Sequence, residues 1–159
     1  MIKKGHLDLP DTSLKERCIK VWDALPYDPG RTSKGIIEKK STKYDPFYNP
    51  HTWEEFNPVL EVISSLTDSS KIQYSFMHVI TRDKLQNAHI HPDAKHSVFV
   101  FYPYLLKEHP PIEFYIDKVW VPFNCTTGDW LYFPKNMLHR VDGRDKDWTE
   151  DRIVISVTI

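Results

Sequence analysis

Two histidines and one aspartate in this chain have the residue types and the spacing of a metal site. His91 and Asp93 are separated by a single residue, and His139 lies further along the chain. Neutral imidazoles and one carboxylate suit a non-haem Fe(II) centre, and three protein ligands leave coordination positions open for other molecules. Side chains alternate along a strand, so His91 and Asp93 are expected on one strand face, and a distant strand must bring His139 to them. These residues predict an iron site on a frame of strands.

Arg152 provides a second chemical feature, an anchor for an anion. It opens the segment RIVISVTI (152–159), in which alternate positions are expected to face the interior of a barrel or sandwich. A buried guanidinium needs an anionic partner, and a carboxylate matches its geometry with two parallel hydrogen bonds. A dicarboxylate cosubstrate bound beside the iron would be such a partner.

The stretches that hold these residues resemble a known superfamily, the Fe(II)- and 2-oxoglutarate-dependent oxygenases, and within it the prolyl hydroxylases. They are HIHPDAKHSVFVFYP (89–103) and GDWLYFPKNMLHRV (128–141), the latter followed by RIVISVTI. The resemblance implies that His91, Asp93 and His139 bind Fe(II). It also implies that Arg152 holds the distal carboxylate of 2-oxoglutarate, that O2 is the second cosubstrate, and that Tyr102 lies near 2-oxoglutarate.

One position departs from the superfamily pattern. Many members have a serine two residues after the arginine, where this chain has Val154, and Ser156 lies two residues further on. The activity that the resemblance implies is hydroxylation of an unactivated C–H bond. A prolyl residue of a peptide or protein is the first expected substrate, and a small molecule is the alternative.

His89 competes with this assignment, because His89 and His91 would also place two imidazoles on one strand face. A His-x-His pair with a later histidine is the outline of a cupin, another metal-binding jelly roll. Here Asn136 stands where cupins commonly have glycine, whereas Asp93 and Arg152 favour the oxygenase. A ligand role, a place beside the ligands or cosubstrate, and a structural role all stay open for His89. A cupin-type metalloenzyme that does not use 2-oxoglutarate and a non-catalytic jelly-roll binding module are the alternative functions.

The composition fits one globular domain. The chain has 159 residues, of which 40% are hydrophobic and 13% aromatic, and this content is enough for a real core. A formal net charge of −1 gives no electrostatic reason to expect a nucleic-acid partner. Two cysteines, Cys18 and Cys125, are too few for a disulfide scaffold and indicate a reducing, cytoplasmic setting. No apolar run reaches the roughly 20 residues of a membrane span.

The first part of the sequence predicts helices. Leu14, Cys18, Val21 and Trp22 have helical spacing within a helix expected over 13–25, which Pro26 ends. The segment 27–50 has no strong periodicity and is expected to be a long loop. A second helix is expected over 52–66, where TWEE (52–55) has the pattern of a capping box.

The second part predicts strands over 72–80, 97–102, 114–121, 130–133 and 153–159. Helices followed by strands, without regular alternation of the two, favour an antiparallel sheet architecture. The predicted fold is mainly β, with a double-stranded β-helix (jelly-roll) core and supporting N-terminal helices. We expect a single domain over 1–159, with the helical part at about 1–68 and the jelly-roll core at about 70–159.

Overall fold

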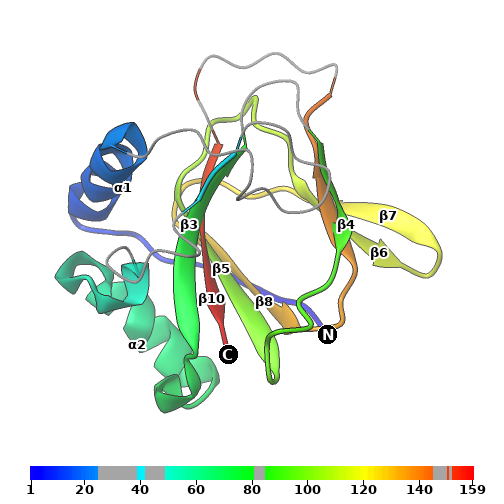
Figure 1. Cartoon of the computed structure of the whole chain (residues 1–159), viewed down its shortest axis with the longest axis horizontal. Helices are drawn as coiled ribbons and strands as arrows, with labels where there is room; N and C mark the ends of the chain where they lie inside the picture. Colours follow the sequence, from blue (N-terminus) through cyan, green and yellow to red (C-terminus); the bar gives the residue numbers. More distant parts are fainter. Residues whose placement is uncertain (25–38, 42–48, 81–84, 145–149, 151) are drawn as a thin grey trace.

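The computed structural model describes residues 1–24, 39–41, 49–80, 85–144, 150 and 152–159, and its strands form two antiparallel sheets (Figure 1). The larger sheet has six strands, in the order β1 (Lys3–His6), β8 (Asp129–Pro134), β5 (Ser97–Tyr104), β10 (Arg152–Thr158), β3 (Tyr74–Ile80) and β2 (Lys39–Ser41). The smaller sheet has four strands, in the order β4 (Leu85–His89), β9 (His139–Asp142), β6 (Ile112–Ile116) and β7 (Val119–Phe123).

From β3 onwards the chain passes repeatedly from one sheet to the other. The strands β3, β5, β8 and β10 belong to the larger sheet, and β4, β6, β7 and β9 belong to the smaller one. Each crossing places the next strand opposite the one before it, so the two sheets close around a shared interior (Figure 1). This confirms the predicted jelly-roll core.

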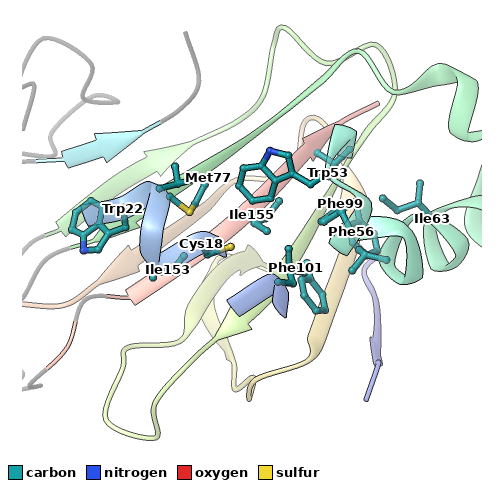
Figure 2. Packing of buried hydrophobic residues seen from close by; sticks show 14 of the residues in the cluster. Cys18, Trp22, Trp53, Phe56, Ile63, Met77, Phe99, Phe101, Ile153 and Ile155 are labelled. Carbon is teal, nitrogen blue, oxygen red and sulfur yellow. The ribbon is translucent and has the colours of Figure 1, made fainter. Parts of the chain in front are cut away.

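Two helices cover the outer face of the larger sheet. They are α1 (Ser13–Ala24) and α2 (Asn57–Leu66), with the short 3-10 turns η3 (Pro50–Thr52) and η4 (Glu54–Phe56) before α2 and η5 (Ser69–Lys71) after it. Cys18 of α1 and Ile63 of α2 are both fully buried in one apolar cluster with Phe56, Phe99 and Ile155 (Figure 2). Removing a ring such as that of Phe56 would cost about 3–5 kcal/mol. The helix predicted over 13–25 is confirmed over Ser13–Ala24, and its expected end at Pro26 lies outside the described residues.

Strand β10 is the central element of the fold, because it pairs with β3 on one side and β5 on the other. Ile153, Ile155 and Val157 belong to the cluster under the helices. Val154 instead belongs to a second buried cluster, which also holds Val100 of β5 and residues of the smaller sheet. The alternation predicted for 152–159 therefore holds, and the even-numbered positions face the space between the sheets.

The predicted second helix begins later than expected. The segment 50–56 forms two 3-10 turns, and the Thr52 hydroxyl donates to the carbonyl oxygen of Asn49 at 2.7 Å, so the capping box over 52–55 is wrong. Pro58 lies in the first turn of α2. Proline has no N–H to donate and its φ suits that turn, so the helix begins at Asn57.

Several strand predictions need correction. The single strand expected over 114–121 is the hairpin of β6 and β7, whose turn residues Asp117 and Lys118 have φ of 49° and 69°. The predicted strand ranges did not include β1, β2, β4 and β9, although a strand was expected to carry His139, and β1 lies in the part expected to be helical. Most of the loop expected over 27–50 lies outside the described residues. Among the described helices, none is long and apolar enough to cross a membrane.

Candidate metal centre and anion anchor

Three histidines meet where β4 and β9 lie side by side in the smaller sheet. His89 is the last residue of β4, and it is the register partner of His139, the first residue of β9. His91 follows two residues later, and its Nε2 lies 3.2 Å from Nε2 of His139. One ligand nitrogen of each of the three lies within 4.8 Å of the others. Within the described part of the chain, this is the one cluster of histidine, cysteine or acidic side chains with metal-site geometry.

The backbone fixes the proton position in two of these rings. Nδ1 of His89 lies 2.8 Å from the carbonyl oxygen of Asn87, and Nδ1 of His139 lies 2.8 Å from that of Met137. A carbonyl oxygen can only accept, so each Nδ1 carries the proton and donates it. Nε2 of each ring therefore keeps its lone pair, and this is the arrangement in which a histidine binds a metal ion.

Burial keeps the centre of the cluster neutral. The side chain of His139 is 4% exposed, and its ring packs against those of Phe114 and Phe133. Burial first, and then the nearby His89 and His91, lower the pKa of His139 well below its ordinary value of 6.5. An imidazole that is neutral at physiological pH is a metal ligand rather than a cation that repels one.

Asp93 lies outside this cluster. Strand β4 ends at His89, and the chain then turns, with the amide of Ala94 donating to the carbonyl oxygen of His91 at 3.1 Å. The expectation that His91 and Asp93 share a strand face is therefore wrong. The exposed Asp93 carboxylate accepts a hydrogen bond from the Tyr74 hydroxyl of β3. The structure brings His91 and His139 together as expected, adds His89 to them, and connects Asp93 to Tyr74, which sequence reasoning did not single out.

Arg152 and Tyr102 lie together in the barrel interior. Arg152 is 2% exposed, its Nη2 donates to the Tyr102 hydroxyl at 3.4 Å, and its Nε donates to the carbonyl oxygen of Pro110 at 3.1 Å. Among the described residues, no carboxylate forms an ion pair with this guanidinium. Burial raises the pKa of Tyr102, so its hydroxyl stays protonated. A buried cation beside a neutral hydroxyl is a site in which an incoming carboxylate would be strongly held.

The position two residues after the arginine is apolar, as the sequence shows. Val154 packs between the sheets, and Ser156 lies one alternation further along β10. The Ser156 hydroxyl lies 3.4 Å from Nε2 of His78, which is buried on β3. Ser156 is thus engaged with His78, and the described contacts of Arg152 do not include it.

Several solved structures that share this fold are hydroxylases or other 2-oxoglutarate-dependent enzymes. A prolyl-4-hydroxylase from Pseudomonas putida matches with a TM-score of 0.70 and 12% identity, over 99% of this chain and 90% of that one. A prolyl hydroxylase from Trichoplax adhaerens, in complex with a peptide fragment of hypoxia inducible factor, matches with a TM-score of 0.69 and 11% identity, over 99% and 81% of the two chains. The non-heme alpha-ketoglutarate-dependent epimerase SnoN, from nogalamycin biosynthesis, matches with a TM-score of 0.69 and 9% identity, over 98% and 76%.

These matches cover nearly the whole chain at very low identity, so they establish the fold. No protein-family model and no curated protein matches the sequence. The fold is that of the prolyl hydroxylase-like 2-oxoglutarate oxygenases, as the sequence motifs predicted.

Proposed function

We propose that this protein is an Fe(II)- and 2-oxoglutarate-dependent dioxygenase that hydroxylates an unactivated C–H bond. The observation that carries the proposal is the pairing, inside one jelly-roll barrel, of a histidine cluster suited to a metal ion with a buried arginine suited to a carboxylate. A metal site alone would fit many enzymes. The buried guanidinium of Arg152 adds a binding site for a carboxylate group of the cosubstrate.

The donor set fits a divalent first-row metal. Such an ion binds imidazole nitrogen at about 2.1 Å, so two nitrogens at right angles on one ion lie about 3 Å apart. The Nε2 atoms of His91 and His139 are 3.2 Å apart, and one neutral ring is already fixed with its lone pair outward. We propose that both residues bind Fe(II). Asp93, the third ligand implied by the sequence motif, stays a prediction.

The second half of the site would hold 2-oxoglutarate. Two of the five N–H donors of Arg152 are used by Pro110 and Tyr102, which leaves enough to bind a carboxylate through two parallel bonds. We propose that Arg152 and Tyr102 hold the distal carboxylate, so that the keto acid end points to the metal. SnoN is described in complex with Fe3+ and alpha-ketoglutarate, which supports this pairing of metal and cosubstrate on the same fold.

Iron with 2-oxoglutarate and O2 supplies the oxidation of a C–H bond when all three are bound. The chain's own part is to position the substrate and the cosubstrate and to exclude water. Phe133 and Phe114 pack against the ring of His139, and Val154 and Val100 extend the apolar interior towards the arginine end of β10. This wall leaves few groups beside the metal that could be oxidised in place of the substrate.

The substrate we propose is a peptide or protein side chain, with proline as the first candidate. The support is the shared fold with the Pseudomonas putida prolyl-4-hydroxylase and with the Trichoplax adhaerens prolyl hydroxylase, which is seen with a bound peptide. The match to SnoN, an enzyme of a biosynthetic route to a small molecule, keeps a small-molecule substrate as the alternative.

An anaerobic titration of the purified chain tests the proposal. Fe(II) is added first and 2-oxoglutarate second, and the weak visible charge-transfer band of a chelated keto acid is followed. We expect the band in the wild type and in His96→Ala, because the side chain of His96 is exposed, and we expect it to disappear in His91→Ala. Iron binding without any band would instead favour a metalloenzyme that does not use 2-oxoglutarate, and absence of iron binding would refute the metal site.

A further inference from the structure

The N-terminal strand β1 brings charged side chains to one edge of the barrel interior. It is the edge strand of the larger sheet and pairs with β8, with Lys4 opposite Leu131 and His6 opposite Asp129 (Figure 1). Leu131 belongs to the buried cluster between the sheets, and residues directly opposite each other in a ladder share a face. Lys4 and His6 therefore lie on the inner face of the larger sheet.

The charge that these two residues meet is the Asp129 carboxylate. Nζ of Lys4 lies 3.6 Å from one carboxylate oxygen, and Nδ1 of His6 lies 2.7 Å from the other. Asp129 is 7% exposed, and its carboxylate also accepts from the amide of Thr126 at 2.8 Å. Burial would raise the pKa of Asp129, but this amide, His6 and Lys4 outweigh it and lower the pKa, so the carboxylate is ionised. The fold thus holds a buried negative charge at this edge.

Lys4 provides compensation that Asp129 does not share with a second carboxylate. Nε2 of His6 lies 2.7 Å from the carboxylate of Asp8, so the charge of a protonated His6 is divided between two acids. The other contact of the Lys4 ammonium is the backbone carbonyl oxygen of Asn124, which is neutral. Among the described carboxylates, Lys4 forms its ion pair with Asp129.

Asp129 lies close to the proposed carboxylate anchor. The register of β5 and β8 makes Tyr102 and Asp129 neighbours across the two strands, and the amide of Gly128 donates to the carbonyl oxygen of Tyr102 at 2.8 Å. Burial raises the pKa of Tyr102 most, and the charge of Asp129 adds to this rise. The Tyr102 hydroxyl in turn accepts from Arg152. A distance on the order of 10 Å therefore separates Asp129 from a carboxylate bound by Arg152.

An uncompensated charge on Asp129 would oppose the anchor. It would repel an incoming carboxylate and attract the guanidinium of Arg152. With an effective dielectric constant of about 20, two unit charges about 10 Å apart change each other's binding about 15-fold. Lys4 has the opposite sign and lies against Asp129, so it cancels much of this effect.

We propose that Lys4 adapts the anchor to a dianionic cosubstrate by compensating the Asp129 charge beside it. This inference rests on the proposed function, in which Arg152 and Tyr102 hold the distal carboxylate of 2-oxoglutarate. Lys4 acts through Asp129 and not by touching the cosubstrate. Its effect therefore concerns the distal carboxylate rather than the keto acid end at the metal.

The experiment compares 2-oxoglutarate with 2-oxopentanoate, a keto acid of the same chain length that lacks the distal carboxylate. Both are titrated anaerobically into the Fe(II)-loaded protein, and the charge-transfer band gives each dissociation constant. In Lys4→Met we expect 2-oxoglutarate to bind about 3- to 10-fold more weakly, because solvent around the partly exposed ammonium screens part of the effect. The affinity for 2-oxopentanoate should not change. Lys3→Met is the matched control: Lys3 lies on the same strand opposite Tyr132, with Nζ 5.9 Å from the centre of that ring, and its loss should leave both affinities unchanged.

The double variant Lys4→Met with Asp129→Asn separates charge from structure. Asparagine keeps an oxygen that can accept from the Thr126 amide but has no charge, so the affinity for 2-oxoglutarate should return to within about twofold of the wild type. If Lys4 had only a structural role, the double variant would be at least as weak as the single one. That result, or an equal loss for both keto acids in Lys4→Met, would overturn the inference and leave the oxygenase proposal standing.

Folding of each variant is checked by far-UV circular dichroism and thermal melting. If Lys4→Met does not fold, Lys4→Gln takes its place with the same expected loss, and wild-type affinity for 2-oxoglutarate in that variant would overturn the inference. If the wild type gave no band with 2-oxoglutarate, the proposed function itself would fail, and this inference with it.

Discussion

Replacing Arg152 with methionine tests the anion anchor while keeping much of the aliphatic bulk. The guanidinium is 2% exposed, and the described residues offer it no carboxylate, so bound 2-oxoglutarate would be its charge partner. Removing one member of a buried, hydrogen-bonded charge pair costs about 2–5 kcal/mol. At about 1.4 kcal/mol for each factor of ten, the affinity for 2-oxoglutarate should fall by roughly 30-fold to a few thousand-fold.

The assay is the anaerobic titration of the Fe(II)-loaded protein with 2-oxoglutarate, from which the dissociation constant of the keto acid is obtained. Fe(II) affinity, measured separately, should not change, because Arg152 does not belong to the histidine cluster. Arg140→Met is the matched control: its guanidinium pairs with Glu113 at 3.0 Å on a partly exposed surface, where such pairs contribute about 0–1 kcal/mol. A folded Arg152→Met variant that bound 2-oxoglutarate within threefold of the wild type would refute the assignment.

Replacing Tyr102 with phenylalanine removes the hydroxyl that accepts from Arg152. One such bond contributes about 0.5–1.5 kcal/mol, so the same titration should show a roughly 2- to 12-fold weaker affinity for 2-oxoglutarate, and an unchanged affinity would contradict the contact. In Gly128→Ala, a Cβ would lie 2.6 Å from the carbonyl oxygen of Leu7 at a φ of 92°. A cost of about 1–3 kcal/mol should lower the Tm by about 2–12 °C in calorimetry, and a wild-type Tm would show that the backbone tolerates a side chain there. Hydrogen bonds to Asp129 first and Asp8 second raise the pKa of His6 above 6.5. The folded state then holds this proton more tightly than the unfolded state, so the stabilisation is present below about pH 6.5 and is lost as the pH rises through the raised pKa. Melting curves between about pH 6 and 8.5 should show a steeper fall of Tm in the wild type than in His6→Gln, and parallel curves would argue against the pairing.

The elements that could be predicted from the sequence are those whose own residues bury an apolar face. The helix α1 carries Cys18 and Trp22 at helical spacing, and β10 is buried on both faces because it lies between the helices and the smaller sheet, with its apolar residues Ile153, Ile155 and Val157 under the helices. Strands β1 and β4 have the sequences KKGH and LQNAH and show no such pattern. These strands form because a neighbouring strand offers backbone hydrogen bonds. The pattern of apolar residues within their own sequence gives no sign of that pairing.

Because the sequence does not show which strands pair or where they end, it predicted only part of the candidate site. The ordered motif predicted that His91 would meet His139, and residue chemistry predicted a buried anchor at Arg152, which lies in contact with Tyr102. The role of His89 stayed open because it depends on where β4 ends. A strand that continued to Asp93 would have placed that carboxylate beside His91, whereas a strand that ends at His89 brings in a third ring.

The position of β10 also has a consequence for how the chain is made. It is the last of the described strands in the sequence, yet it lies between β5 and β3 in the middle of the larger sheet. While the ribosome is still adding these residues, the facing edges of β3 and β5 have no partner, and such edges bind other exposed strands readily. Arg152 arrives with the same strand. A nascent chain therefore lacks the proposed carboxylate anchor until the sheet has closed, and the proposed binding of 2-oxoglutarate would favour finished molecules over incomplete ones.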